Sequence, residues 1–413
     1  MLFVNEQFYS VADLEALQNK CEQLNLFEDG EKKRIAVCLN DPFEMLALFF
    51  YVRKKGSSIT LIHSSSPKEA AVRAANETSS HLLFYQSLEN PIDLNRETDE
   101  SMGVLIQMSS GTTGKPKCIE RTWEEIDTEI ESYNQALSGQ KEKTTIIMCP
   151  ITHSYGLISG VLSSLNRGIT PVIITNQNPK YMVKMLKKYP EHLLYASPAL
   201  LQTLCHFVEK DMKLDCVMTS GMLLPKKLFV QLKKITNQLS QQYGCSEAGC
   251  VLMKHQLTSH EEIGFPLSHL EIETGTDETE PSEIVIHLGN KTIYTKDLGY
   301  FNATGGIFYL ERIDDMINVA GLNVYPHQVE EVILEHPKIK DIVVYKKTDL
   351  YAGERVCCQF VSDEEGLDVQ ELRKWCFHQL PSHQIPIECK QVNAIERLPN
   401  GKISRKKLVE VSG

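Results

Sequence analysis

The sequence lacks an excess of basic residues and lacks cysteine pairs at metal-binding spacing. Its 43 Lys and Arg stand against 54 Asp and Glu, which gives a formal net charge of −11 at pH 7. A protein that binds nucleic acid broadly needs cationic side chains to displace counterions, so this balance argues against that class. The twelve cysteines are scattered, apart from the adjacent Cys357 and Cys358, which argues against a structural zinc site and a disulfide scaffold.

Long apolar runs are also missing. No stretch approaches the roughly 20 apolar residues that a helix needs to span a bilayer. The amino-terminal MLFVNEQFYSVADLEAL carries acidic residues early and lacks the basic-then-apolar order of a signal peptide. We therefore expect a cytoplasmic protein with no membrane span. A chain of 413 residues is too long for one ordinary core, so two or three subdomains are expected.

The sequence does contain a repeated alternation of strand and helix. RIAVCL, DPFEMLALFFYVRKKG and SSITLIH, within residues 34–63, read as strand, helix and strand. Similar alternations occupy 144–175 and 192–221. Such units favour a parallel sheet in a large α/β body. The β-rich stretches from 269 to 314 leave no room for helices and predict an antiparallel subdomain.

The pattern changes again near the charged segment ERIDD at 311–315. The remaining hundred or so residues predict a small α+β unit of ordinary domain size. We therefore divide the chain into an amino-terminal domain, 1–312, and a mobile carboxy-terminal domain, 313–413. The predicted fold class is α/β.

The segment QMSSGTTGKPKCIERT, residues 107–122, has the composition of a phosphate-binding loop. A P-loop requires GxxxxGK[ST], but here Gly111 and Gly114 are three residues apart and Pro116 follows the lysine, so that interpretation fails. The glycines still permit a tight turn, and the hydroxyls and lysines supply donors and charge. Taken alone, the segment could equally be a solvated turn.

SSGTTGKPK resembles the phosphate-binding signature of the adenylate-forming superfamily, which comprises acyl-CoA synthetases, aryl-acid adenylating enzymes, peptide-synthetase adenylation domains and luciferases. Four further segments resemble motifs of that superfamily in the same order. They are YGCSEAG (243–249), YTKDLGYF (294–301), ERIDDMINVAGLNVYPHQVEEVI (311–333) and LPNGKISR (398–405). Five matches in order cover the chain from about residue 30 to its end.

The resemblance implies two half-reactions. A carboxylate attacks the α-phosphate of ATP and expels pyrophosphate, and the acyl adenylate then passes to a phosphopantetheine thiol while AMP leaves. The first step needs countercharge and positioning more than a base. By resemblance, Lys402 bridges the carboxylate, the α-phosphate and the ribose. Without the resemblance, Lys402 would be interpreted as a surface residue of a basic tail.

The resemblance also assigns the nucleotide site. Glu247 would bind Mg²⁺, which prefers one or two carboxylates with phosphate oxygens and water. Tyr243 would stack on adenine, Asp297 would accept hydrogen bonds from the ribose hydroxyls, and Arg312 would contact ribose or phosphate. The other residues expected to bind ATP are Ser109, Ser110, Gly111, Thr112, Thr113, Lys117, Gly221, Met222, Gly244 and Ser246.

The resemblance extends to the hinge and the acid pocket. Asp314 matches the hinge residue about which the carboxy-terminal domain rotates between the two half-reactions. One state presents Lys402, and the other brings the segment near Gly321 to the thiol. His153 resembles the histidine that lines the acyl pocket, and Ser197 lies in a segment resembling another wall of the site.

Three positions depart from the superfamily pattern. Cys118, Lys296 and Glu311 each stand where glycine is usual. None of the three replacements removes a charged group that contacts nucleotide, so activity is still expected.

The acid is less well determined than the reaction. Ser154 stands where enzymes for 2,3-dihydroxybenzoate usually have asparagine. The compact length and short amino-terminal lobe resemble the stand-alone 3,4-dihydroxybenzoate adenylating enzymes of petrobactin-type siderophore pathways, which load an aryl carrier protein. Two alternatives stay open: a fatty-acyl or other acyl-CoA ligase using free coenzyme A, and a non-catalytic nucleotide-binding protein of the same fold.

Overall fold

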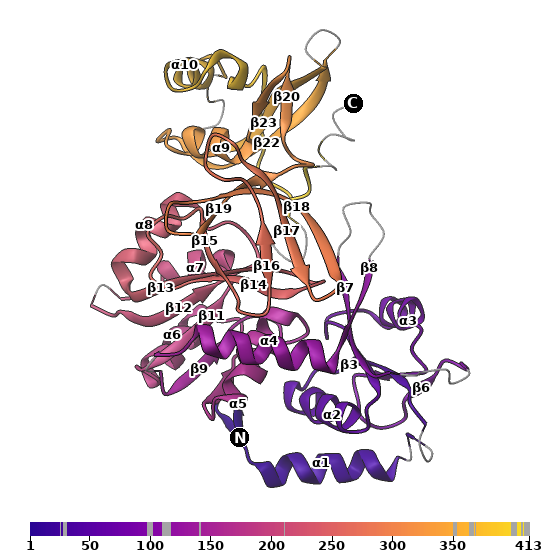
Figure 1. The fold of residues 1–413 in the computed structure, drawn as a ribbon. Coiled ribbons are helices and arrows are strands. Elements are labelled where there is room, and N and C mark those ends of the chain that lie inside the picture. Colours follow the sequence, from indigo (N-terminus) through magenta and orange to yellow (C-terminus); the bar gives the residue numbers. More distant parts are fainter. Residues whose placement is uncertain are drawn as a thin grey trace.

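The computed structural model covers residues 1–413 (Figure 1). The residues it describes are 1–24, 26–27, 31–96, 102–109, 117–139, 142–209, 211–349, 353–362, 367, 369–397, 403–405 and 408. Three sheets organise this part of the chain. None of its helices combines the length and apolarity that crossing a bilayer requires.

The first sheet forms the amino-terminal lobe. Its strand order is β6-β5-β3-β4-β7-β8. The strands are β3 (Arg34–Cys38), β4 (Ser58–Leu61), β5 (Leu82–Tyr85), β6 (Ile92–Asp93), β7 (Val104–Ser109) and β8 (Lys117–Thr122). The predicted strand–helix–strand unit is confirmed, because β3 and β4 are parallel and joined by α2 (Pro42–Lys54). Asp41 caps this helix and Pro42 occupies its first turn, as the sequence indicated.

The second sheet is the largest and changes character along its width. Its thirteen strands run in the order β16-β17-β18-β19-β15-β14-β13-β12-β11-β9-β10-β1-β2. The parallel part comprises β1 (Leu2–Val4), β10 (Thr170–Ile173), β9 (Thr144–Ile147), β11 (His192–Ala196), β12 (Leu214–Thr219) and β13 (Thr236–Cys245). Two of the predicted alternations form this part.

The antiparallel part continues from β13 and confirms the expected β-rich subdomain. Its strands are β14 (Gly249–Lys254), β15 (Glu262–Pro266), β16 (Glu271–Glu273), β17 (Ser282–Leu288), β18 (Lys291–Phe301) and β19 (Ile307–Arg312). β2 (Gln7–Tyr9) pairs antiparallel with β1 at the opposite edge. No feature of the sequence predicted that residues 2–9 join this sheet.

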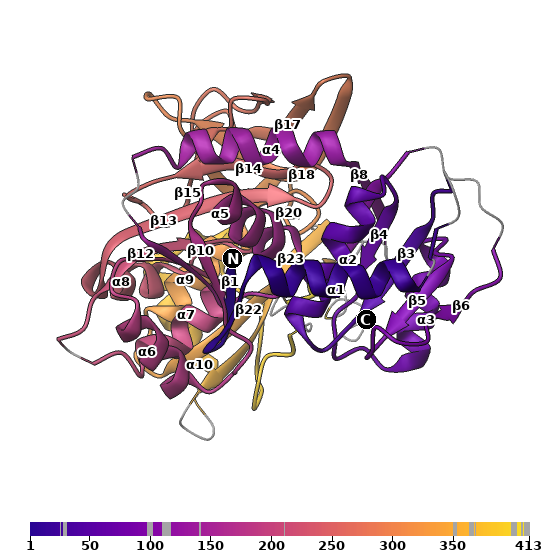
Figure 2. The same cartoon turned by 90° about the horizontal axis from the view of Figure 1, so that it is seen from below.

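Helices cover the two sheets of the body. They are α1 (Val11–Gln23), α3 (Lys68–Glu77), α4 (Trp123–Ala136), a π-helix (Tyr155–Leu162) continued by α5 (Ser163–Asn166), α6 (Pro179–Lys188), α7 (Pro198–Cys205) and α8 (Lys226–Ile235). α4 leaves β8 and lies along β14, as both views show (Figure 2). It thereby connects the amino-terminal lobe to the large sheet.

The third sheet belongs to the carboxy-terminal segment. It contains β20 (Ile317–Val319), β21 (Leu322–Val324), β22 (Ile339–Asp349), β23 (Gly353–Ser362) and β24 (Glu388–Gln391). Helices α9 (Pro326–Leu334) and α10 (Val369–Gln379) and a short 3-10 turn (Ser382–Gln384) complete it. This α+β unit lies above the rest of the molecule in Figure 1.

Separate cores support the predicted division of the chain. The carboxy-terminal core includes Ile333, Val344 and Phe360, and it shares no member with the cores of the body. The division at residues 312 and 313 is itself a prediction. From these cores we expect the two units to lose stability independently.

We expect Phe360→Ala to unfold the carboxy-terminal unit preferentially. Phe360 is fully buried, and truncating a buried Phe costs about 3–5 kcal/mol. Hydrogen exchange should therefore rise in β22 and β23 but not in β3 and β4. The matched control is Phe84→Ala, which removes an equally buried ring from the amino-terminal lobe and should produce the opposite pattern. Simultaneous loss of protection in both units would contradict independent cores.

Candidate nucleotide and acid site

The carboxyl ends of the parallel strands bring several predicted residues to one edge of the large sheet. Neighbouring β9, β11, β12 and β13 are parallel, so the segments that leave them emerge on the same side. His153 follows β9, Gly221 and Met222 follow β12, and Ser246 and Glu247 follow β13. Ligands of open α/β sheets bind at such an edge. Sequence order alone could not have placed these segments side by side.

The centre of the nucleotide residues is a hydrogen-bonded group. The Tyr243 hydroxyl donates to Asp297 Oδ2 at 2.6 Å, and Arg312 Nη1 lies 3.2 Å from Asp297 Oδ1. Asp297 and Arg312 also face each other across β18 and β19. Burial is the main cause that raises the pKa of Tyr243, and the Asp297 carboxylate raises it further, so the phenol stays protonated and donates.

This group joins the two halves of the large sheet. Tyr243 lies on β13, where a β-bulge separates Tyr243 from Gly244, and Asp297 comes from the antiparallel part. A carboxylate has several acceptor positions, so Asp297 is suited to receive hydrogen bonds from hydroxyls. The structure therefore brings three of the predicted ATP-binding residues together.

A second group lies where β9 approaches the amino-terminal lobe. The Ser154 hydroxyl donates to the Gln107 side-chain oxygen on β7. Gln107 was not among the predicted residues, although a lone polar residue in the apolar run VLIQMS was a signal. The contact places the start of the phosphate loop beside the His153–Ser154 segment, because Ser109 follows on the same strand.

His153 is exposed at this edge. Desolvation by the surrounding protein lowers its pKa, and the charge of His63 lowers it further. His63 follows β4 of the amino-terminal lobe and was also missed. A neutral imidazole can donate or accept a hydrogen bond. Such a ring could orient the acid, while the positive charge that the carboxylate needs is assigned to Lys402. Ser197, in contrast, caps α7 through a 3.4 Å bond from the Leu200 amide.

Several predicted residues lie outside the part that the structure describes. These are Ser110, Gly111, Thr112, Thr113 and Lys402. The side chain of Ser109 is also undescribed, although its backbone ends β7. Lys117 is exposed at the start of β8, where it pairs with Ser109 across the two strands. Cys118 is the next residue on the same strand and pairs with Met108 of β7.

Glu247 has the surroundings that a metal ligand needs. It is half-buried in the turn after β13, and within the described residues no basic side chain forms an ion pair with it. No group of three or more His, Cys, Asp or Glu residues able to hold a metal was found in the same part of the chain. A site with one protein carboxylate fits Mg²⁺ held mainly by phosphate oxygens and water.

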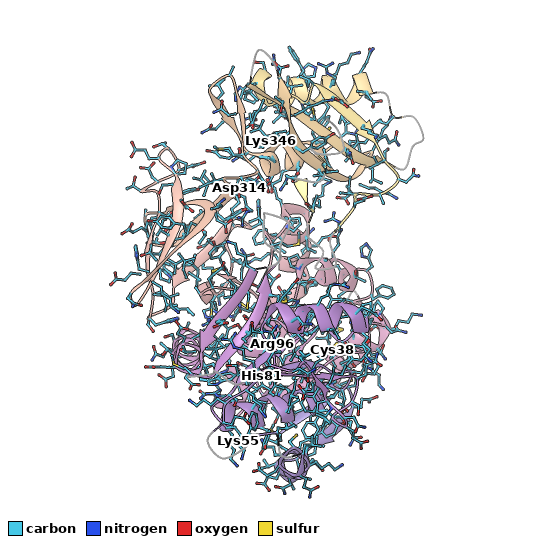
Figure 3. The ribbon with its side chains drawn as sticks, turned by 90° about the vertical axis from the view of Figure 1, so that its right-hand side faces the viewer. Cys38, Lys55, His81, Arg96, Asp314 and Lys346 are labelled. Atoms are coloured by element: carbon cyan, nitrogen blue, oxygen red, sulfur yellow. The ribbon has the colours of Figure 1, made fainter. Side chains whose placement is uncertain are left out.

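Lys296 lies beside Asp297 and reaches the predicted hinge. Its backbone has φ +61°, a left-handed conformation that explains why glycine would be the easier residue here. Its ammonium lies 3.2 Å from the Asp314 carboxylate. Asp314 lies where the carboxy-terminal unit meets the rest of the molecule (Figure 3).

Glu311, the other departure, binds the carboxy-terminal unit directly. Its buried carboxylate accepts hydrogen bonds from the backbone amide and the ring Nδ1 of His327 on α9, both at 3.1 Å. Burial raises the pKa of Glu311, but His327 and the cation of Arg405 outweigh burial and lower it to about 2. Burial lowers the pKa of His327, but Glu261 and Glu311 outweigh burial and raise it to about 9.

Another contact crosses the interface between the units. On α8, Lys227 donates to the Leu334 carbonyl, near the end of α9 where cations are favourable. Arg405 acts within the carboxy-terminal unit, where it binds Glu330 at 2.7 Å and Asp315 at 3.2 Å. The Glu311–His327 and Lys227–Leu334 contacts therefore join the two units in the observed arrangement.

The sequence matches the model of the AMP-binding enzyme family over residues 35–287 and that of the AMP-binding enzyme C-terminal domain over 328–402. It is also 40% identical to the 3,4-dihydroxybenzoate–[aryl-carrier protein] ligase of Bacillus anthracis, over 99% of this chain and 98% of that protein. The chain belongs to the AMP-binding enzyme family. It is an adenylate-forming ligase.

Solved structures of AMP-binding enzymes share the fold. The O-succinylbenzoate coenzyme A synthetase of Bacillus subtilis, in complex with AMP, superposes with a TM-score of 0.84 at 20% identity, covering 98% of this chain and 94% of that chain. An anthranilate CoA ligase in complex with anthranoyl-AMP gives a TM-score of 0.82 at 15% identity, covering 99% and 93%. At these identities the likeness establishes the fold alone.

We expect the Glu311–His327 contact to make stability depend on pH. The pKa of His327 is about 9 when folded, against 6.5 for a free histidine, so its contribution is complete below pH 6.5 and is lost as pH rises through 9. The melting temperature of the wild type should fall over this range, and that of His327→Gln should change less. His192→Gln is the control, because burial lowers the pKa of His192 and reverses the sign. Parallel pH curves for wild type and His327→Gln would contradict the contact.

Proposed function

We propose that this chain adenylates 3,4-dihydroxybenzoate with ATP and transfers the aryl group to the phosphopantetheine thiol of an aryl carrier protein in siderophore biosynthesis. The observation that carries the proposal is the 40% identity, along nearly the whole of both chains, to the ligase of that name. The arrangement of Tyr243, Asp297 and Arg312 supports it, since these residues form one contiguous group at the ligand-binding edge.

The nucleotide residues have distinct roles in the first half-reaction. Asp297, oriented by Tyr243 and Arg312, accepts hydrogen bonds from the ribose hydroxyls. Arg312 supplies positive charge near ribose or phosphate, and the loop after Ser109 cradles the phosphates. Glu247 would hold Mg²⁺, which neutralises phosphate charge when bound.

The acid residues position the carboxylate for attack. One of its oxygens bonds to the α-phosphorus while the bond to pyrophosphate breaks, so no proton has to move. Two anions approach each other, which is why Lys402 is assigned to this step. His153 faces the acid. Position 154, where enzymes for 2,3-dihydroxybenzoate usually have asparagine, carries a serine whose hydroxyl donates to the Gln107 side chain.

The carrier protein is the proposed acceptor, and coenzyme A is the second candidate. The O-succinylbenzoate and anthranilate enzymes are both named as coenzyme A ligases, which favours keeping that candidate. In either case the thiolate attacks the acyl carbon and the bond to AMP breaks. The two acceptors share phosphopantetheine and differ only in what carries it.

Pyrophosphate exchange with a panel of acids tests the first half-reaction. We expect exchange with 3,4-dihydroxybenzoate, weaker exchange with 2,3-dihydroxybenzoate, and none with long-chain fatty acids. Lys402→Ala should lower exchange by about 100-fold or more, the scale for a group that stabilises transition-state charge. Lys406→Ala is the control, because it removes a neighbouring lysine of the same basic tail. Exchange only with fatty acids would refute the aryl substrate.

Replacement of the hinge residue tests the alternation between half-reactions. Asp314→Pro should leave exchange largely intact and lower thioester formation, because proline fixes a backbone dihedral that must rotate. Asp314→Ala is the matched control, since it removes the Lys296 ion pair without restricting the backbone. Thioester formation should be measured with carrier protein and with coenzyme A in separate reactions. Equal losses in both half-reactions of Asp314→Pro would contradict rotation about this residue.

A further inference from the structure

A buried ion pair lies behind the turn that carries Ser246 and Glu247. Arg121 Nη1 on β8 lies 2.7 Å from Glu129 Oε2 on α4, and the side chains are 2% and 0% exposed. Arg121 ends the 107–122 segment but lies outside its SSGTTGKPK signature, and Glu129 lies in none of the motifs described above. Arg121 lies shortly after the phosphate loop, on the strand that leaves it.

The pair contacts the backbone of the turn directly. Glu129 Oε1 accepts a hydrogen bond from the Cys250 amide at 2.8 Å. Gly249 has φ +75°, and a Cβ placed on it would lie 2.2 Å from Glu129 Oε2 and 2.5 Å from Arg121 Nη1. Glycine is therefore required here for both conformation and space. The Glu129 carboxylate and the Arg121 guanidinium therefore pack directly against the backbone of Gly249 and Cys250 at the end of the turn.

A second contact from the same helix holds the strand that enters the turn. The Tyr133 hydroxyl, one turn further along α4, donates to the Gln242 side chain at 2.7 Å. Gln242 immediately precedes Tyr243, and Cys250 follows the turn. α4 therefore fixes both strands of the 243–249 motif, while Arg121 connects the same helix to the strand after the phosphate loop.

The buried polar side chains of Arg121, Glu129 and His269 are a poor way to stabilise a core. Within the described residues, Arg121 Nε and both ring nitrogens of His269 have no hydrogen-bond partner. Burial and the charge of Arg121 lower the pKa of His269 to about 4, so this neighbour stays neutral and does not add a second cation. Replacing a buried ion pair by packed apolar residues is often neutral or stabilising, so stability alone does not account for the pair.

We propose that Arg121 and Glu129 are positioning residues for the nucleotide. They hold the turn bearing Glu247 against β8 and α4, so that the carboxylate keeps the position in which it would meet the Mg²⁺ of the bound nucleotide. The inference rests on the proposed function, because it takes Glu247 and the loop as the MgATP-binding elements. Neither residue touches the reacting atoms.

The chain offers a matched control for the test. Glu142 and Arg167 form a second buried ion pair, whose side chains are 0% and 15% exposed, and Arg167 Nε likewise lacks a hydrogen-bond partner in the described residues. Glu142 precedes β9, at the opposite end of that strand from the ligand-binding edge. Glu129→Gln and Glu142→Gln therefore remove the same charge from similar surroundings, one behind the turn and one far from it.

The experiment measures MgATP binding to the full-length protein by calorimetry, without acid, and then pyrophosphate exchange. Glu129→Gln should weaken MgATP binding at least about tenfold and raise the KM for ATP, since a misplacement of roughly 1 Å can cost on the order of 100-fold. The KM for the acid should stay near the wild-type value. Glu142→Gln should keep wild-type MgATP affinity, even if its melting temperature falls as much as that of Glu129→Gln.

The outcomes separate this inference from the proposed function. Equal MgATP affinities of the two variants would overturn the positioning role. If Glu129→Gln does not fold, the same assay is run on Arg121→Lys, which keeps the positive charge but has a shorter side chain without the guanidinium. Weaker MgATP binding by this variant supports the positioning role, and unchanged binding overturns it. A wild type that binds MgATP but exchanges no pyrophosphate with any acid would refute the proposed function, while the binding comparison would still test the positioning.

Discussion

The hydrogen bond from Tyr243 to Asp297 is the contact on which the site depends. It joins the last parallel strand of the large sheet to the antiparallel strands beyond it, and Arg312 completes the group. A parallel sheet exposes the carboxyl ends of its strands at one edge, which is where loops can collect around a ligand. The antiparallel extension adds the Asp297 carboxylate and the Arg312 guanidinium beside this edge. Both kinds of sheet therefore contribute to the predicted nucleotide site.

The residues next to this group connect chemistry to domain arrangement. Lys296 precedes Asp297 and pairs with the predicted hinge residue Asp314, and Glu311 precedes Arg312 and binds His327 of the carboxy-terminal unit. Successive side chains of a strand point to opposite faces. On β19, Arg312 can therefore face the predicted nucleotide site while Glu311 contacts the carboxy-terminal unit. The left-handed backbone of Lys296 is a local strain that the ion pair and the surrounding sheet offset.

Buried polar contacts recur wherever two elements must keep a fixed distance. The Arg121–Glu129 pair holds α4 against β8 and the 243–249 turn, and Tyr133 holds the same helix against β13. Such contacts contribute little net stability, but they are directional, whereas apolar packing is not.

The sequence determined the kinds of element and their order, because hydrophobic periodicity is local, and the resemblance of its contiguous motifs to the adenylate-forming superfamily implied the reaction class. The strand–helix alternations, the antiparallel stretch, the α+β unit and the residues Tyr243, Asp297 and Arg312 could all be predicted from it. Only the tertiary structure decided which segments become neighbours. It placed residues 2–9 at the edge of the large sheet, His63 near His153, Gln107 against Ser154, and Glu311 against His327. These contacts join positions far apart in the chain, and no local pattern encodes them, because pairing across a sheet or between domains depends on the packing of the whole chain.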